Sequence, residues 1–113
     1  MALCDNLQLV MERSAALGAI TEISSRFSRE ESLLMFERTC FIRQFEQRVK
    51  RAYDEKHIKM PVYLSLGQES VAVALSIAFP KAAIFAQHRA HDLYLAYGGD
   101  PRALVDELLH RKS

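Results

Sequence analysis

The spacing of apolar residues along the chain predicts a series of helices, of which the longest runs from residue 28 to about residue 55. Apolar side chains recur there in steps of three and four: Leu34, Phe41, Phe45, Val49 and Ala52. This spacing puts them on one face of an amphipathic helix. Ser28 and Glu31 have the spacing of a capping box, in which each side chain binds the backbone N–H of the other residue. The helix is therefore expected to begin just after Ser28.

Charged and polar residues occupy the opposite face of this helix. They include Arg43, Glu46, Gln47, Lys50 and Arg51. Glu46 and Lys50 are four residues apart, a spacing at which opposite charges support a helix. The basic residues alone suggest a nucleic-acid patch, but the acidic residues close by favour a solvated helix face.

Residues 3–23 and 71–79 are also predicted to be helical. In the first segment apolar residues recur at roughly helical spacing, although Gly18 weakens the helix by ~1 kcal/mol relative to alanine. The second is an apolar run that follows Gly67 and ends before Pro80, and its length and small alanines favour a helix over a strand. Because the run is apolar nearly all round, it is expected to be buried on most sides.

The C-terminal part of the chain predicts one strand and two short helices. Residues 83–86 are apolar between polar neighbours, which indicates a short buried strand. Residues 93–97 are expected to form a helix that ends at the glycine pair 98–99. Asp100 and Pro101 then supply the N-cap and the first residue of a last helix, whose apolar pattern continues in phase to the end of the sequence.

These elements predict a mainly α chain with about five helices and one short strand. A lone strand cannot pair its own backbone N–H and C=O groups, and parallel strands need neighbours. Either other chains supply those neighbours, or the chain is the opening part of a larger α/β domain with a parallel sheet. Residues 1–27 are expected to form an N-terminal helical arm, and residues 28–113 an incomplete part of that domain.

Composition and charge argue against several classes of function. Half of the 113 residues are apolar and 26% are charged, which is typical of a globular protein. The formal net charge of +1 is too small to attract nucleic acid or an acidic membrane. No apolar run approaches the ~18 residues of a membrane span, and the start resembles no signal or transit peptide, so a cytoplasmic protein is expected. Cys4 and Cys40 match no metal or redox spacing, and Cys40 is expected to be a buried structural thiol.

Polar side chains that can do chemistry gather at residues 87–92, directly after the predicted strand. In open α/β sheets, ligands bind beyond the carboxyl ends of strands. Arg89 can bind a phosphate with a bidentate fork, and Gln87 and His88 can add neutral donors. His91 can titrate near neutral pH. The alternative is a loop whose histidines cap helix ends or face solvent.

Tyr63 and Ser65 lie in a loop beside a predicted helix start, where side chains can face a ligand. The alternative is that both are packing and turn residues. The sequence contains no Gly-rich phosphate loop, because the glycine pair 98–99 fits neither the GxGxxG pattern nor a P-loop. No set of histidine, cysteine or carboxylate residues has the spacing of metal ligands, and no catalytic triad is visible.

Four segments resemble motifs of the α subunits of thiamine-diphosphate-dependent 2-oxo acid dehydrogenases. Residues 42–49 (IRQFEQRV) resemble that family's RxFExRV helix, and residues 61–73 (PVYLSLGQESVAV) resemble its HLSxGQEAVAVG segment. Residues 85–91 (FAQHRAH) resemble its YRAH segment, and residues 98–111 (GGDPRALVDELLHR) resemble its GGDPRxLxxELxGR stretch. Each motif alone is weak, but the four in this order and spacing are specific.

The resemblance implies that residues 28–113 are the N-terminal part of a thiamine-diphosphate-binding domain. It implies an α2β2 assembly with a β subunit, with the cofactor at the α/β interface. The family decarboxylates a 2-oxo acid oxidatively and passes the acyl group to the lipoyl domain of an acyltransferase, while the cofactor supplies the carbon chemistry. Arg89 matches the family's diphosphate-binding arginine. His88 stands where a tyrosine usually contacts the cofactor, and Gln87 matches a glutamine of branched-chain members.

Two residues depart from the family pattern. Tyr63 stands where many pyruvate-type members have an active-site histidine, and Asp92 replaces a common glycine. Tyr63 and His91 are the candidate catalytic residues. The family's magnesium-binding GDG…N signature is expected beyond Ser113, so the chain is expected to hold no metal ligands and to be inactive alone. The alternative is a non-catalytic helical interaction module that retains a dehydrogenase-like docking surface.

Overall fold

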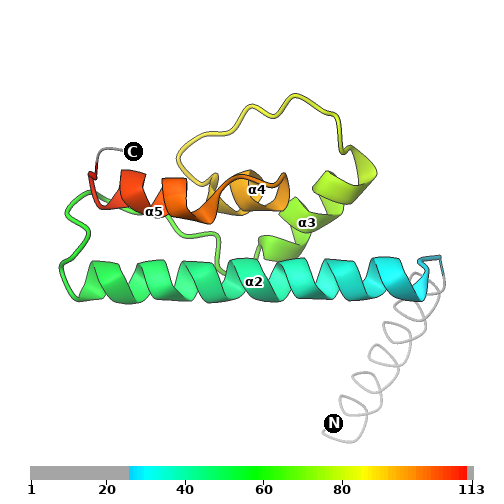
Figure 1. Ribbon diagram of the computed structural model, residues 1–113, viewed down its shortest axis with the longest axis horizontal. Coiled ribbons are helices and arrows are strands. Elements are labelled where there is room, and N and C mark those ends of the chain that lie inside the picture. The colour runs from blue at the N-terminus through cyan, green and yellow to red at the C-terminus, as the bar shows by residue number, and fades with distance from the viewer. Residues whose placement is uncertain (1–25, 112–113) are drawn as a thin grey trace, which may run out of the picture. The chain divides into compact units, whose positions relative to one another are not determined.

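The computed structural model describes residues 26–111, and these residues are mainly helical. The helices of this part are α2 (Arg29–Asp54), α3 (Glu69–Ala78), α4 (His91–Ala96) and α5 (Pro101–Leu108) (Figure 1). The chain divides into two compact units, residues 1–34 and residues 35–113. The helix expected at residues 3–23 lies outside the described residues, and the domain boundary expected after residue 27 stays a prediction.

Helix α2 begins and ends at hydrogen bonds between residues that are close in sequence. At its start the N–H of Ser28 donates to Glu31 Oε2 (2.9 Å), and the N–H of Glu31 donates to Ser28 Oγ (3.1 Å). The predicted capping box is therefore confirmed. At its end Lys56 adopts a left-handed φ of 66°, and the N–H of His57 donates to the carbonyl of Ala52 (2.9 Å). This is a Schellman motif, in which the left-handed residue is usually glycine.

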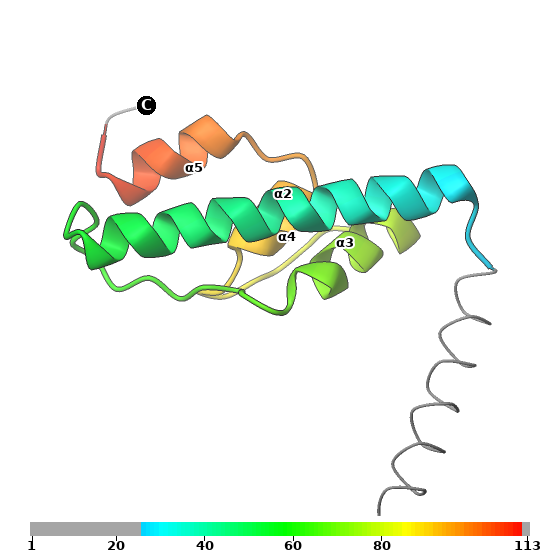
Figure 2. The same ribbon diagram turned by 90° about the horizontal axis from the view of Figure 1, so that it is seen from below.

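Within residues 35–113, α2 packs against the other helices. In Figure 1, α3, α4 and α5 lie along the same side of α2, and the view in Figure 2 shows α5 and α3 on opposite sides of the line of α2. The buried apolar side chains come from all of these helices and from the loop after α2: Ile42, Phe45, Val49, Ile58, Ala72, Val73, Leu95, Ala96, Leu104 and Leu108. The hydroxyl of Tyr97 lies 3.1 Å from the carbonyl oxygen of Leu75 and 3.2 Å from that of Phe79. It thereby ties the end of α4 to the end of α3.

The prediction of a strand at residues 83–86 is wrong for this chain. No residue from 26 to 111 is in a strand, and residues 80–90 form a loop that arches from α3 to α4 (Figure 1). Phe85 in this loop is 97% exposed. A strand needs hydrogen-bond partners on a neighbouring strand, and the described residues offer none. The mainly helical character is confirmed, whereas no parallel sheet forms within the described residues.

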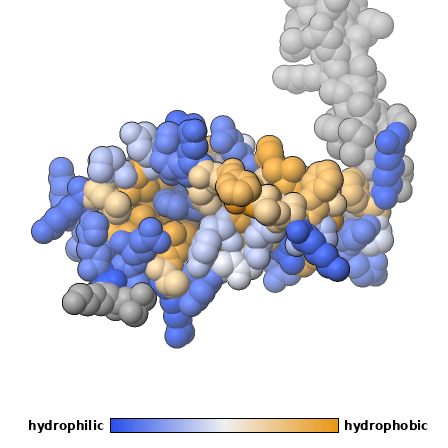
Figure 3. All heavy atoms as spheres, turned by 90° about the horizontal axis from the view of Figure 1, so that it is seen from above, coloured by the Kyte–Doolittle hydropathy of each residue, from blue (hydrophilic) through white to orange (hydrophobic). Residues whose placement is uncertain are grey.

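Helix α3 is buried on one face only, so the expectation of burial on most sides is wrong. Ala72 and Val73 are buried, whereas Val71 is 61% exposed and Phe79, at the end of the helix, is 60% exposed. Figure 3 shows apolar residues gathered over the part of the molecule where α3 and the following loop lie. Exposed apolar patches of this kind mark surfaces that bind other molecules or other parts of a protein.

The two C-terminal helices begin as the sequence predicts, or nearly so, but the last one ends early. Helix α4 begins at His91, two residues before the predicted start. Helix α5 has the predicted cap, because Asp100 Oδ1 accepts the N–H of Arg102 (2.9 Å). The expectation that α5 continues in phase to the end of the sequence is wrong. His110 adopts a left-handed φ of 52°, and its N–H donates to the carbonyl of Glu107 (3.0 Å), which closes the helix.

Candidate functional site

Several of the side chains that the sequence singles out line one hollow. Tyr63, Gln87, His88 and His91 share, with mainly apolar neighbours, a hollow of about 400 Å³. The rings of Tyr63 and His88 have their centroids 4.5 Å apart and their planes tilted by 57°. Arg89 is not part of the lining. The fold thus brings the loop before α3 and the loop before α4 to one place, although they are far apart in sequence.

Arg89 stands next to this lining in sequence, on the exposed loop before α4. Its side chain is exposed and forms no ion pair with any residue from 26 to 111. The nearest acidic residue in sequence, Asp92, is buried, and its Oδ1 accepts the N–H of Leu93 (2.8 Å). Gln87 and His88 are exposed as well. The end of the loop at residues 87–89 therefore presents the positive charge of Arg89, which no carboxylate of the described residues offsets, together with neutral donors, and this donor set fits a phosphate-bearing anion.

Glu46 contradicts the prediction of a solvated position. Its side chain is fully buried, with 0% exposed, and Oε1 lies 3.4 Å from Nδ1 of His91. Neither carboxylate oxygen has a hydrogen-bond partner among the described residues. The expected partner, Lys50, instead contacts Asp54, with 2.6 Å between Nζ and Oδ2. The structure thus places a buried acid–histidine pair beside the hollow, because the side chain of His91 is 13% exposed and lines it.

A small rotation of α2 relative to the predicted orientation explains this error. The buried residues of α2 are Ile42, Phe45, Glu46 and Val49, which follow the i, i+3, i+4, i+7 pattern of a buried helix face. Phe41, which was expected in the apolar stripe, is 47% exposed. The sequence signal for a buried carboxylate was therefore the position of Glu46 inside this pattern. Acidic residues are almost never fully buried unless they are paired, so such a position also predicts a partner.

A second buried carboxylate holds the end of the loop that carries Tyr63. Glu69, in the first turn of α3, is 1% exposed. Arg43 of α2, also expected on a solvated face, binds both of its oxygens, with Nη2 2.8 Å from Oε2 and Nε in contact with Oε1. The N–H of Gly67 donates to Oε2 (3.0 Å). These hydrogen bonds, the one from Arg43 foremost, lower the pKa of Glu69 from 4.5 to about 2 against the opposing effect of burial.

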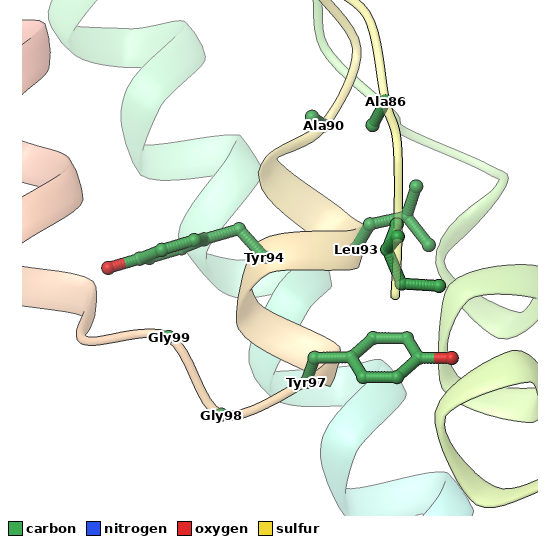
Figure 4. Close-up of a pocket in the computed structure, with 8 residues that line it drawn as sticks. Ala86, Ala90, Leu93, Tyr94, Tyr97, Gly98 and Gly99 are labelled. Atoms are coloured by element: carbon green, nitrogen blue, oxygen red, sulfur yellow. The ribbon is translucent and has the colours of Figure 1, made fainter. Parts of the chain in front are cut away.

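A second cavity, of about 440 Å³, lies between the loop at residues 84–86 and α4. Figure 4 shows the side chains of Tyr94 and Tyr97 extending in opposite directions beside it. Its lining is apolar and contains no charged side chain and none of the predicted site residues. It offers no acid, base or anion-binding group, so the hollow beside Tyr63 and His91 is the better candidate.

A third hollow, of about 560 Å³, is lined mainly by residues of α2 and α5 together with Ile58 and Arg111, and none of the predicted site residues belongs to its lining. No group of three or more histidine, cysteine, aspartate or glutamate side chains among residues 26–111 is placed to hold a metal ion. No helix in the described part is long and apolar enough to cross a membrane. Cys40 is a free thiol and is only half-buried, which is less than was expected. Ser65 is buried, and its hydroxyl has no hydrogen-bond partner in this part of the chain.

The chain has relatives among curated proteins, although no protein-family model and no solved structure matches it. It is 38% identical over 87 residues to the pyruvate dehydrogenase E1 component subunit alpha of Zymomonas mobilis, an alignment that covers 75% of this chain and 25% of that protein. The chain belongs to the family of 2-oxo acid dehydrogenase α subunits. The resemblance inferred from the four motifs is therefore confirmed.

Other relatives of this α-subunit chain carry the same name. The mitochondrial pyruvate dehydrogenase E1 component subunit alpha of Chaetomium thermophilum is 38% identical over 72 residues, which cover 63% of this chain and 18% of that protein. The mitochondrial subunit of Saccharomyces cerevisiae is 27% identical over 113 residues, which cover 96% of this chain and 27% of that protein. The chain thus spans 18–27% of the length of these relatives. The activity and the partners of a whole α subunit are therefore proposals here.

Proposed function

We propose that this chain is part of the α subunit of a thiamine-diphosphate-dependent dehydrogenase, which oxidatively decarboxylates a 2-oxo acid and passes the acyl group to a lipoyl domain. The observation that carries the proposal is the exposed loop on which Gln87, His88 and Arg89 follow one another, with no ion pair to Arg89 from residues 26–111. Membership of the family supports it, because the motif match gives the diphosphate-binding role to Arg89. The helical fold alone supports no activity, because function resides in the site.

The residues of the chain bind and orient the cofactor in this proposal. Arg89 offsets the negative charge of the diphosphate with its fork of N–H donors, and Gln87 and His88 donate further hydrogen bonds. Tyr63 and His91, which line the same hollow, are proposed as catalytic residues that face the reacting atoms. Thiamine diphosphate supplies the carbanion chemistry when it is bound. The ligands of the accompanying magnesium ion are proposed to come from outside these 113 residues.

The chain is proposed to need partners for activity. A hydrogen bond to a charged group contributes ~1.5–3 kcal/mol, whereas even millimolar affinity requires about 4 kcal/mol. The missing contacts are proposed to come from a β subunit in an α2β2 assembly, and the acyl acceptor from a lipoyl-bearing acyltransferase. We expect no turnover of a 2-oxo acid by the isolated chain. Pyruvate is the first substrate to assay, because the relatives are named for it.

The loop at residues 80–90 is proposed to pack against a parallel sheet that is formed by residues outside the range 26–111. Ile84 is 41% exposed and Phe85 is 97% exposed, so their apolar side chains are available for burial against other elements. This would complete an α/β fold of which these helices are the opening part. The cytoplasm is the proposed location, although two of the relatives are named mitochondrial, and cell fractionation decides between the two compartments.

The decisive experiment is cofactor binding by the assembly formed with a β subunit. Isothermal titration with thiamine diphosphate and Mg²⁺ measures the affinity of the wild type and of Arg89→Ala. If Arg89 contributes one charged hydrogen bond, the substitution weakens binding by ~10–150-fold. Arg51→Ala is the matched control, because Arg51 is also exposed and forms no ion pair with the described residues. Equal affinities for the wild type and Arg89→Ala would refute the site.

A second candidate function is a non-catalytic helical interaction module. The observation that favours it is the apolar surface of α3, where Val71, Leu75 and Phe79 are 61%, 38% and 60% exposed. In such a module, Val71→Glu abolishes binding of a partner chain and Arg89→Ala does not alter it. In the dehydrogenase subunit, Arg89→Ala weakens cofactor binding while the assembly persists. Gel filtration of the co-expressed chains, combined with the cofactor titration, separates the two candidates.

A further inference from the structure

One ionisable group beside the hollow has no role in the proposed cofactor contacts. The carboxylate of Glu46 is fully buried on α2, and neither of its oxygens accepts a hydrogen bond from the described residues. An ion moved out of water costs several kcal/mol unless a partner compensates it. The cations close to it on α2 are engaged elsewhere, because Arg43 binds Glu69 and Lys50 binds Asp54.

The imidazole of His91 is the group placed to compensate Glu46. Its Nδ1 lies 3.4 Å from Glu46 Oε1, and that nitrogen is itself buried without a hydrogen-bond partner among residues 26–111. The two buried atoms form no hydrogen bond as they stand, and a small approach with a proton on Nδ1 lets them satisfy each other. The proton belongs on Nδ1 when Glu46 is a carboxylate, because the carboxylate can only accept.

We propose that Glu46 is a positioning residue that accepts the Nδ1 proton of His91. This interaction fixes the tautomer of the ring and leaves Nε2 of the neutral imidazole without a proton, so that Nε2 accepts a hydrogen bond or a proton from a ligand in the hollow. A carboxylate that holds a histidine in one tautomer is a recurring device in enzyme sites. The inference deepens the proposed function and rests on it only for the identity of the ligand.

The arrangement also accounts for what happens when Nε2 takes up a proton. The ring then carries a positive charge in a place where only 13% of its side chain is exposed. The negative charge of Glu46 at 3.4 Å offsets that charge without any movement of the chain.

The test reads the tautomer directly on the full chain, with ¹⁵N-labelled histidine and long-range ¹H–¹⁵N correlation spectra at about pH 8.5, above the usual histidine pKa. In the wild type we expect His91 to carry its proton on Nδ1 and none on Nε2. His110, which is exposed, serves as the internal reference for an unconstrained ring. An unprotonated Nδ1 on His91 at that pH would overturn the proposal.

Three variants separate positioning from a general effect on folding. Glu46→Met removes the acceptor, and the spectrum of His91 is expected to move to the pattern of His110. Glu46→Gln keeps an acceptor oxygen, so the Nδ1–H form is expected to persist. Glu107→Met makes the same change at an exposed residue of the same hollow and is expected to leave His91 unaltered. If Glu46→Met does not fold, the wild type and Glu46→Gln still decide the question.

This experiment and the cofactor titration fail independently. The tautomer is a property of the chain without any cofactor, whereas the titration measures binding by the assembly. Loss of the expected effect of Arg89→Ala would refute the proposed function and leave the role of Glu46 standing. An unprotonated Nδ1 would refute the role of Glu46 and leave the diphosphate contacts untouched.

Discussion

The buried carboxylate of Glu69 is expected to make the folded chain sensitive to acid. Its pKa falls from 4.5 to about 2, chiefly because Arg43 hydrogen-bonds to it. A tenfold change in proton affinity is ~1.4 kcal/mol, so a fall of this size corresponds to about 3 kcal/mol. Water screens the pair, because the side chain of Arg43 is 45% exposed, and we therefore expect about 1–2 kcal/mol for Glu69.

The direction of the pH dependence follows from the lowered pKa. The unfolded chain holds the Glu69 proton more tightly than the folded chain does, so acid favours the unfolded state. The contribution of Glu69 to the free energy of unfolding is fully present above about pH 5. It is lost as the pH falls from 4.5 towards 2.

The perturbation that isolates this effect is Glu69→Gln, which keeps the shape of the side chain and removes its charge. Urea unfolding followed by circular dichroism gives the free energy of unfolding and checks that the urea dependence is unchanged. At pH 7 the variant is expected to be less stable than the wild type by the ~1–2 kcal/mol worked out above. At pH 2.5 most of the difference is expected to disappear, because the unfolded wild-type chain then binds a proton at Glu69 that the folded chain largely does not.

The control is the exposed pair of Lys50 and Asp54, whose side chains are 55% and 57% exposed. Exposed ion pairs contribute little to stability, so Asp54→Asn is expected to change the unfolding curve hardly at all. The reasoning is wrong if Glu69→Gln loses the same stability at pH 2.5 as at pH 7. It is also wrong if Asp54→Asn costs as much as Glu69→Gln at neutral pH.

Three further substitutions test local contacts through thermal and urea unfolding. Gly99→Ala is expected to lower the melting temperature and to cost ~1 kcal/mol or more of unfolding free energy, because the added Cβ overlaps the ring of Tyr94 and forces that ring to move. An unchanged melting temperature would contradict this packing. Tyr97→Phe removes the hydroxyl that binds the carbonyl groups of Leu75 and Phe79. The free energy of unfolding is expected to fall by ~1 kcal/mol. No effect is expected if water replaces the hydroxyl as the partner of these carbonyl groups. Lys56 has a left-handed φ of 66°, a conformation that costs residues other than glycine ~1–2 kcal/mol, and Lys56→Gly removes this cost. Part of the gain is lost because glycine has greater freedom in the unfolded chain, so the free energy of unfolding is expected to rise by up to ~1 kcal/mol. A fall in the free energy of unfolding would refute the strain at Lys56.

Signals within a few residues predicted where helices begin. Ser28 and Glu31 form the expected capping box, and Asp100 caps α5, because each of these contacts joins residues two or three positions apart. A signal of that length is complete in the sequence. The end of α5 was harder to predict, since His110 takes a left-handed conformation that usually belongs to glycine.

Contacts between distant segments decided what the sequence could not predict. A step of one residue turns a helix face by about 100°, so the choice between Phe41 and Ile42 as the buried residue of α2 depends on what packs against it. Ile42 is buried, and Glu46, four residues later on the same face of α2, is buried with it. The segment at 83–86 has the composition of a strand, but a strand depends on a neighbour that the described residues do not contain.

Part of the candidate site was predicted, from the polarity of its residues and from the family motifs rather than from local helix signals. Tyr63, Gln87, His88 and His91 were singled out by their polarity and by the family motifs, and the fold brings them to one hollow. Glu46 was missed because an acidic residue on a helix is usually solvated. Its burial could not be predicted from α2 alone, because it depends on the position of His91 at the start of α4.

Three of the four motifs that carry the family resemblance contact one another through buried carboxylates. Residues 42–49 supply Arg43 and Glu46, which lie on α2 three positions apart. Arg43 binds Glu69 in the motif at 61–73, and Glu46 faces His91 in the motif at 85–91. A buried carboxylate is costly unless its partner is in place, so each pair penalises any packing in which these segments do not meet. The Arg43–Glu69 pair attaches the loop that carries Tyr63 to α2, and the Glu46–His91 pair attaches the loop that carries His88 to the same helix. The hollow therefore keeps its shape although its lining comes from separate parts of the sequence.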